Sequence, residues 1–88
     1  MNRYNYEPGI INIDVIDDYK ILVKFSDNID GIIDCKHILN IPMFIKLIDY
    51  EYFKSASISV FGRGDITWPN GEDISATSIY KELTHKQK

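Results

Sequence analysis

The sequence predicts a small α+β domain with a mainly antiparallel sheet of about five strands and two short helices, in the order βββαββα. Five short segments alternate apolar and polar residues, which is the period of a strand with one buried face. Two further segments space their apolar residues as an amphipathic helix does. The chain also contains 16 isoleucines against 4 leucines and 2 alanines, and β-branched residues favour sheet over helix. Its 88 residues leave room for one domain.

Three strands are predicted in the first half of the chain, over residues 11–15, 19–25 and 29–35. In the second of them the apolar and aromatic side chains share one face: Tyr19, Ile21, Val23 and Phe25. Asp17-Asp18 and Ser26-Asp27-Asn28 separate the strands, because Asp and Asn tolerate left-handed backbone. Gly31 weakens the third strand. The three segments together predict an antiparallel meander.

A helix is predicted over residues 42–49, because Asn40-Ile41-Pro42 is a helix-start pattern in which the missing N–H of proline costs little. The apolar residues that follow helical spacing there are Ile41, Phe44, Ile45 and Ile48. Residues 50–53 are expected to form a turn anchored by Phe53.

Two more strands are predicted over residues 57–61 and 65–68, on either side of a three-residue hairpin loop at Gly62-Arg63-Gly64. Pro69-Asn70-Gly71 ends the second of them, because proline cannot extend a hydrogen-bonded ladder. A last helix is expected to be capped by Asp73 or Ser75, with Ile79 and Leu83 on one face.

In terms of domains, we expect a flexible N-terminal leader over residues 1–8, a single domain over residues 9–84 and a polar C-terminal tail over residues 85–88. The start of the chain lacks the apolar core of a signal peptide, and no stretch approaches 18 apolar residues. The single cysteine, Cys35, excludes an intrachain disulfide and fits a reducing compartment. These features predict a cytoplasmic protein that does not associate with membranes.

The charge balance argues against direct binding of nucleic acid. The formal net charge is -3, and ten Lys and Arg residues are scattered among thirteen acids. Non-specific binding to nucleic acid depends on clustered positive charge that neutralises phosphates. The tyrosines and phenylalanines could stack on bases, but that mode needs a basic groove beside them, and Lys46, Lys54 and Arg63 are too dispersed to predict one.

The motifs of catalysis and metal binding are incomplete. Cys35 and His37 supply two metal ligands where zinc needs three or four, and no third group marks a Cys–His nucleophile. The acids Asp14, Asp17 and Asp18 lack the spacing of a calcium loop. Gly62-Arg63-Gly64 lacks the lysine and the following helix of a phosphate loop. The sequence therefore predicts no enzyme activity, no cofactor and no metal.

The segment from Trp68 to Asp73 is the candidate site, and two interpretations of it stay open. In the first, Trp68 closes the core, the turn reverses the chain, and Asp73 or Ser75 caps the last helix. In the second, Trp68 is partly exposed and forms a binding patch for another protein together with aromatic residues from 50–53, because Trp and Tyr are favoured at interfaces. The residues of this candidate site are Trp68, Pro69, Asn70, Gly71, Asp73, Tyr52 and Phe53.

The order of these landmarks resembles the small bacterial family known as domain of unknown function 2442. The landmarks are Asp18-Tyr19-Lys20-Ile21, Phe25, Asp27, Asp34, Phe44, Leu47, Asp49, Phe53, Trp68-Pro69-Asn70-Gly71-Glu72-Asp73 and Tyr80. The similarity covers about residues 9–84, and its sharpest motif is Trp-Pro-Asn-Gly-x-Asp. One departure is Asn28, where the family often has glycine; asparagine also tolerates positive φ, so the expected fold is unaffected.

The resemblance implies an α+β domain with an antiparallel sheet and no catalytic residues to carry over. It also implies that members are often encoded beside another small protein, in pairs that look like toxin–antitoxin operons. We therefore predict a protein-interaction module whose partner is another small protein, with the neutralising member of such a pair as its specific form. The alternatives are a non-catalytic domain that binds nucleic acid or a small ligand, and a homodimer formed through an edge strand.

Overall fold

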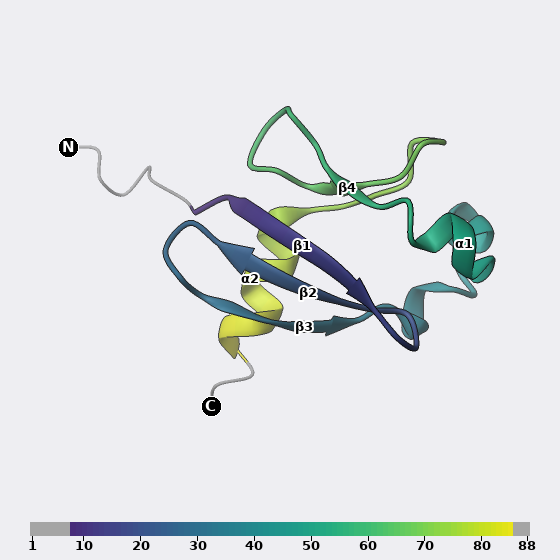
Figure 1. The fold of residues 1–88 in the computed structure, drawn as a ribbon, viewed down its shortest axis with the longest axis horizontal. Coiled ribbons are helices and arrows are strands. Elements are labelled where there is room, and N and C mark those ends of the chain that lie inside the picture. Colours follow the sequence, from purple (N-terminus) through teal and green to yellow (C-terminus); the bar gives the residue numbers. More distant parts are fainter. Residues whose placement is uncertain (1–7, 86–88) are drawn as a thin grey trace.

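The computed structural model describes residues 8–85, and over this range the chain folds into two small antiparallel sheets, a C-terminal helix and short helical turns between the sheets (Figure 1). The α+β class is as predicted. Of the expected leader and tail, residues 1–7 and 86–88 lie outside the described residues.

The first sheet is the predicted meander, in the order β1-β2-β3. Its strands are β1 (Ile10–Ile16), β2 (Lys20–Phe25) and β3 (Asp30–Asp34). Both pairs are antiparallel, with Ile21 opposite Val15 on one side and Ile33 on the other. The alternation of the sequence becomes an alternation of burial, since Ile21, Val23 and Phe25 are buried while Leu22 and Lys24 are exposed.

Tyr19 lies outside the strand in which the alternation places it. It belongs to the turn between β1 and β2 and has a φ of 60°, a conformation that is costly for a bulky side chain. Its ring packs edge-on against Tyr50 and Phe53, with centroids 5.3 and 5.2 Å away, and its hydroxyl donates to the carbonyl oxygen of Ile48. These contacts keep the side chain at the core although the backbone has left the strand.

The segment between the sheets contains three short helical elements, 3₁₀ helix η2 (Lys36–Ile38), 3₁₀ helix η3 (Pro42–Ile48) and α-helix α1 (Tyr50–Phe53). The expected α-helix over 42–49 is therefore wrong in type, and the expected turn at 50–53 is one turn of α-helix. A 3₁₀ helix has three residues per turn, so Phe44 and Leu47 share the inward face while Ile45 and Ile48 are exposed. Asp49 caps α1, because its side chain accepts the Glu51 N–H at 3.1 Å.

The second sheet corrects the prediction of a single sheet of about five strands. Its strands are β4 (Ser57–Ile58), β5 (Ile66–Thr67) and β6 (Asp73–Ile74), each two residues long, and they pair in that order. The alternating segments 57–61 and 65–68 predict longer strands, but the hairpin opens beyond the Ser59 N–H bond to the Asp65 carbonyl oxygen, at 2.8 Å. β6 is too short to leave a periodic pattern and has no counterpart in the sequence prediction.

Helix α2 (Ala76–His85) covers one face of the first sheet. Ser75 provides the predicted cap, accepting the Ser78 N–H at 3.3 Å, whereas Asp73 lies in β6. Ile79 and Leu83 are buried against the sheet as predicted. A Cβ atom at Gly31 would lie 2.8 Å from Leu83 Cδ2, so the glycine leaves room for the leucine side chain. Thirteen buried hydrophobic residues form the core of the described chain: Ile10, Ile21, Val23, Phe25, Ile33, Cys35, Leu47, Phe53, Ile66, Trp68, Ala76, Ile79 and Leu83. No helix of the described chain is long and apolar enough to span a membrane.

Candidate functional site

The candidate segment Trp68–Asp73 forms the hairpin that joins β5 to β6. The Trp68 N–H donates to the Glu72 carbonyl oxygen at 3.0 Å, and the Gly71 N–H donates to the Trp68 carbonyl oxygen at 2.9 Å. Gly71 has a φ of 102°, which favours glycine at the last residue of a three-residue loop. Pro69, Asn70 and Gly71 thus reverse the chain, as predicted, and Asp73 follows on the surface.

Trp68 and Phe53 belong to the core. Trp68 is 2% exposed and Phe53 is fully buried, with ring centroids 5.9 Å apart. The indole Nε1–H donates to the Phe53 carbonyl oxygen at 2.9 Å, so the one polar group of the ring is satisfied inside the protein. The structure thus agrees with the core interpretation of Trp68, and neither ring is available to a partner on the folded surface.

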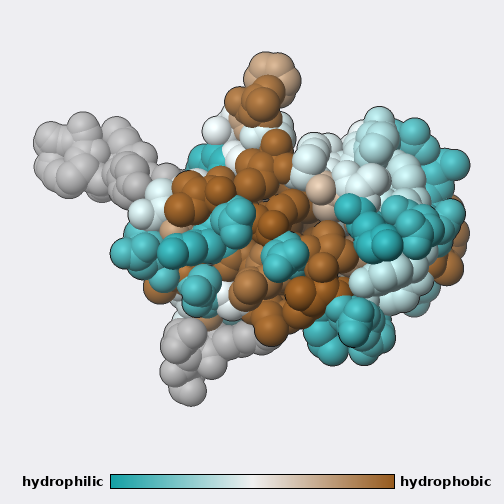
Figure 2. Space-filling model, viewed as in Figure 1, coloured by the Kyte–Doolittle hydropathy of each residue, from teal (hydrophilic) through white to brown (hydrophobic). Residues whose placement is uncertain are grey.

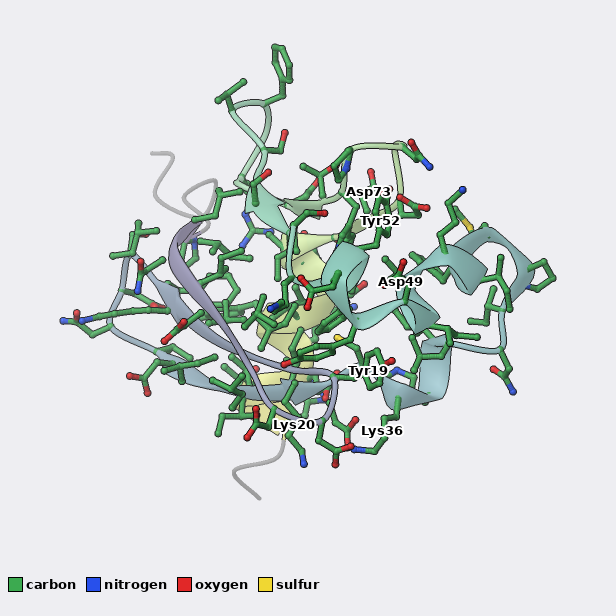
Figure 3. All side chains as sticks on the ribbon, turned by 45° about the vertical axis from the view of Figure 1, so that its right-hand side comes forward. Tyr19, Lys20, Lys36, Asp49, Tyr52 and Asp73 are labelled. Atoms are coloured by element: carbon green, nitrogen blue, oxygen red, sulfur yellow. The ribbon has the colours of Figure 1, made fainter. Side chains whose placement is uncertain are left out.

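Tyr52 links α1 to this hairpin. Its hydroxyl donates to Glu72 Oε1 at 2.7 Å and accepts the Asn70 N–H at 2.8 Å. Glu72 is only 6% exposed, and Figure 3 shows Tyr52 close to the strand that carries Asp73. Desolvation, and then the hydrogen bond to Glu72, raise the pKa of Tyr52 above its usual value. Glu72 is absent from the candidate residues taken from the sequence. Its role depends on the hydrogen bond from Tyr52, which lies twenty residues away in the chain.

Four of the candidate residues form, together with Glu72, a structural unit that we call the clamp, whereas Asp73 lies outside it on the surface. Tyr52, Asn70 and Glu72 close it from outside, and Phe53 and Trp68 fill it from inside. A shallow hollow of about 240 Å³ lies beside the clamp, lined by Ile45, Lys46, Asp49, Tyr52 and Asn70.

Cys35 and His37 line a second cavity, of about 210 Å³, between β3, η2 and α2. Burial, and then the nearby Asp34 charge, raise the pKa of the Cys35 thiol to about 12. A thiol with this pKa stays protonated and is a poor nucleophile. Over residues 8–85 no group of three or more His, Cys, Asp or Glu side chains is arranged to hold a metal ion.

Asp18, in the turn between β1 and β2, belongs to a network of ion pairs. Asp18 Oδ2 lies 2.9 Å from Lys36 Nζ and 3.4 Å from Lys20 Nζ, and Asp34 Oδ2 lies 3.2 Å from Lys36 Nζ. Figure 3 shows Lys20 and Lys36 projecting from the same end of the molecule. Hydrogen bonds from Lys36 and Lys20 lower the pKa of Asp18, and the Lys36 backbone N–H, with its ammonium group, lowers that of Asp34. Through the Lys36–Asp18 pair, this network links η2 to the turn between β1 and β2.

Gly62-Arg63-Gly64 is part of the loop between β4 and β5, consistent with the turn interpretation. Both glycines have positive φ, and the Arg63 side chain donates to the Pro8 carbonyl oxygen. The Ile10 N–H donates to the Arg63 carbonyl oxygen at 3.0 Å. The loop is thereby attached to the start of β1.

The first sheet has one face that α2 does not cover, which we call the open face. At its centre Leu22 and Ile32 are cross-strand neighbours, 39% and 46% exposed. Charged side chains surround this pair: Asp14, Lys20, Lys24, Asp30 and Asp34. Figure 2 views this face and shows hydrophobic residues gathered along the sheet between hydrophilic patches. Sequence periodicity predicts which residues alternate on a strand, but it does not show which face a helix covers.

Of the other exposed apolar side chains, Ile11 lies in β1 and is 57% exposed, and the rest lie outside the sheet. Val60 and Phe61, at the tip of the β4–β5 loop, are 88% and 79% exposed. Ile41, Met43, Ile45 and Ile48 are exposed on and beside η3. None of these residues belongs to the candidate set taken from the sequence.

Comparison with known proteins agrees with the landmark order in the sequence. The family model described as "Protein of unknown function (DUF2442)" matches residues 10–85, from the first residue of β1 to the last residue of α2. No curated protein and no solved structure matches the chain. The match spans both sheets and the clamp around Trp68, and on this basis the chain belongs to the DUF2442 family.

Proposed function

We propose that this chain is a protein-interaction module without catalytic activity of its own, and that its partner is another small protein. The observation that carries this proposal is the open face, where the exposed Leu22–Ile32 pair lies within a border of charged side chains. An apolar centre with a polar rim is the usual organisation of a protein–protein interface.

The arrangement of the polar groups supports a non-catalytic role. Tyr52 and Glu72 are hydrogen-bonded to each other within the clamp, and Asp18 and Asp34 form ion pairs with Lys36. The Cys35 thiol, whose pKa burial raises to about 12, stays protonated well above neutral pH. These groups stabilise the fold, so they are poorly suited to act as nucleophile or base.

The charges also favour a protein over a nucleic acid as partner. Lys20 and Lys36 are engaged by Asp18 and Asp34, and Lys54 lies 3.2 Å from Glu51. Lysines that already neutralise carboxylates contribute less to the binding of phosphates. Binding of RNA or DNA is therefore the alternative that the test below includes.

The finer form of the proposal is that the partner is the product of an adjacent gene and that this chain neutralises it. The paired-gene context expected from the family resemblance supports this form. We also propose the cytoplasm as the compartment, because a single, buried and unpaired cysteine suits a reducing environment.

The experiment is co-expression of this chain with the product of the adjacent gene, followed by size-exclusion chromatography with light scattering. We expect a stoichiometric complex, and restored growth if the partner alone is toxic. The double variant Leu22→Lys/Ile32→Lys should weaken the complex by about tenfold or more, which corresponds to about 1.4 kcal/mol or more. Both side chains are exposed, so the variant should keep its fold.

The matched control is Val60→Lys/Phe61→Lys, which makes the same chemical change at the loop tip, away from the open face. This control should bind as the wild type does. A complex that only the loop-tip variant weakens would contradict the open face as the binding surface. If the two proteins do not associate, or if the isolated chain binds RNA tightly in a salt-dependent manner, the proposed function is wrong.

A further inference from the structure

Among the described residues, no strand pairs with the outer edge of β3. β2 and β3 pair antiparallel, and the Phe25 N–H bond to the Ile29 carbonyl oxygen and the Cys35 N–H bond to the Tyr19 carbonyl oxygen fix the hydrogen-bonding alternation. Gly31 and Ile33 therefore bond to β2, while the N–H and C=O groups of Ile32 point away from the sheet. In the described chain β3 is the last strand on its side, since the order is β1-β2-β3.

The opposite edge of the sheet is less accessible. The Ile10 N–H is bonded to the Arg63 carbonyl oxygen, and β4 lies against β1. A side chain at Gly64 would approach the Ile10 carbonyl oxygen to 2.9 Å, which shows how closely the β4–β5 loop covers the start of β1. An added strand would therefore pair with β3.

A cavity lies at the C-terminal end of β3, on the side of the sheet that α2 covers. The cavity, of about 210 Å³, separates the end of β3 from α2. Its apolar lining consists of Ile33, Cys35, Ile38, Ile74 and Ile79, and its polar lining of Asp34, His37, Ser78 and Glu82. Figure 1 shows α2 passing behind the sheet and reaching beyond β3. We call this edge and the adjoining cavity the β3–α2 groove. A strand lying in it would turn alternate side chains toward the open face and toward the cavity.

The charges along β3 specify the chemistry of the missing strand. On the open face β3 presents Asp30, Ile32 and Asp34 in a row. Their cross-strand neighbours on β2 are, in the same order, Lys24, Leu22 and Lys20. The outer side has no corresponding strand over residues 8–85. Asp34 is already bridged to Lys36 at 3.2 Å, whereas Asp30 has no ion-pair partner in that range. A basic side chain opposite Asp30 and an apolar one opposite Ile32 would therefore complement the row.

A second copy of this chain fits the groove poorly. Antiparallel pairing of two β3 strands about Ile32 would place Asp30 of each copy against Asp34 of the other. Like charges directly opposite each other are destabilising, and acidic side chains on an edge discourage pairing between copies. The charge pattern therefore favours a basic segment of a different protein over a homodimer.

From these observations we propose that the β3–α2 groove binds an extended segment of the partner protein by strand addition. The segment carries alternating basic and apolar residues on the open-face side, and an aliphatic side chain on the other side that enters the cavity. Main-chain hydrogen bonds to Ile32 supply the register and the pocket supplies selectivity. This inference rests on the proposed function and adds to it the site and the chemistry of the partner.

A peptide experiment tests the groove without the natural partner. The probe is a soluble peptide that contains Lys-Ile-Leu-Val-Lys, which reproduces the pattern of β2, and the control peptide replaces both lysines with glutamates. Binding is followed by amide and methyl NMR shifts of the full chain. We expect the lysine peptide to bind about tenfold more tightly than the glutamate peptide. The shifts should be concentrated on β3 and α2.

Two variants of the chain sharpen the test. Ile32→Pro removes the outward N–H and is tolerated only on a free edge, whereas the matched Ile32→Thr keeps the N–H and a β-branched side chain. Ile32→Pro should abolish peptide binding, Ile32→Thr should retain it, and Asp30→Lys should reverse the preference between the peptides. Asp30→Lys leaves the backbone unchanged, so it tests the charge pattern even if Ile32→Pro fails to fold.

The outcomes separate this inference from the proposed function. Shifts that spread over the open face or the loop tip but spare β3, or equal affinity for both peptides, would overturn strand addition. If the adjacent-gene product binds while Asp30→Lys and Ile32→Pro leave its affinity unchanged, the interaction module stands and the groove does not. If two copies of the chain instead pair with each other through β3 and form a symmetric dimer, the proposal of a segment from a different protein is wrong.

Discussion

Trp68 holds together parts of the chain that are far apart in the sequence. Its ring packs against Phe53, and its Nε1–H donates to the Phe53 carbonyl oxygen, fifteen residues away. Around this contact Tyr52 and Glu72 close the surface. The most distinctive motif of the sequence therefore contributes to stability, and the exposed residues that can contact a partner lie elsewhere.

Truncation of Trp68 tests this assignment. Trp68→Ala should destabilise the fold by about 3–5 kcal/mol, the usual range for removing a buried aromatic side chain. Val60→Ala, at a residue that is 88% exposed, should change stability by only about 0.5 kcal/mol or less. Urea unfolding followed by circular dichroism measures both. Equal effects of the two changes would contradict the core position of Trp68.

Cys35 gives a second test at the scale of one residue. Its thiol has a pKa raised from 9.0 to about 12, chiefly by burial. Because the thiolate is the reactive form, the folded protein at pH 8 should react with a disulfide reagent at least about a hundredfold more slowly than the urea-unfolded chain. Fast, complete labelling of the folded protein would show that the cavity beside β3 exposes the thiol.

At the scale of elements, short segments are held in place by contacts outside their own secondary structure. β4, β5 and β6 have only two residues each, so the second sheet depends on the clamp at one end and on the loop that covers β1 at the other. Helix α2 is attached to the end of the β4–β5 loop, because the Ala76 N–H donates to Asp65 Oδ1 at 2.8 Å. Its Tyr80 hydroxyl donates to Asp27 Oδ2 at 2.6 Å, which ties it to the turn between β2 and β3.

Two glycines of the β4–β5 loop test how that loop is docked. Both have positive φ, so alanine carries a backbone cost at either position. At Gly64 a Cβ atom would also lie 2.9 Å from the Ile10 carbonyl oxygen and 3.0 Å from Ile58 Cγ2, whereas at Gly62 it would meet open space. Gly64→Ala should therefore cost about 1–3 kcal/mol more than Gly62→Ala in denaturant unfolding. Equal costs would contradict the contact between this loop and β1.

The extent to which these elements follow from the sequence depends on their length. The meander is predictable because alternation over five to seven residues already separates Ile21 and Val23 from Leu22 and Lys24. β6 and α1 are not predictable, because two or four residues contain no period. The 3₁₀ form of η3 cannot be predicted from the sequence either, because its apolar residues also fit the spacing of an α-helix. Only the burial of Leu47 in the structure shows that the turn has three residues.

At the scale of the molecule, the clamp around Trp68 and the open face play different roles. The candidate residues could be named from the sequence because tryptophan, proline and Asn-Gly are locally distinctive. Their role as a clamp could not, because it depends on Glu72 and Tyr52 meeting across twenty residues. The open face and the β3–α2 groove depend on where α2 lies, which no local pattern specifies.

The surface carboxylates predict how the whole molecule responds to acid. The Tyr80 hydrogen bond lowers the pKa of Asp27, and Lys36 lowers those of Asp18 and Asp34, from an ordinary value of 3.8. Their stabilising contribution is therefore present above pH 3.8 and is lost as the pH falls through the lowered values. Tm should drop on acidification in this range. Asp27→Asn should lower Tm at neutral pH and flatten the drop, and an unchanged profile would contradict the Asp27–Tyr80 link.

The most direct test of the central claim, that a partner strand completes the sheet at β3, is amide hydrogen exchange at two adjacent residues. In the free chain the outward N–H of Ile32 should exchange quickly, while the N–H of Ile33, bonded to β2, should be protected. In the complex with the partner, Ile32 should become protected as Ile33 already is. An Ile32 amide that exchanges at its free rate in a fully formed complex would contradict the account.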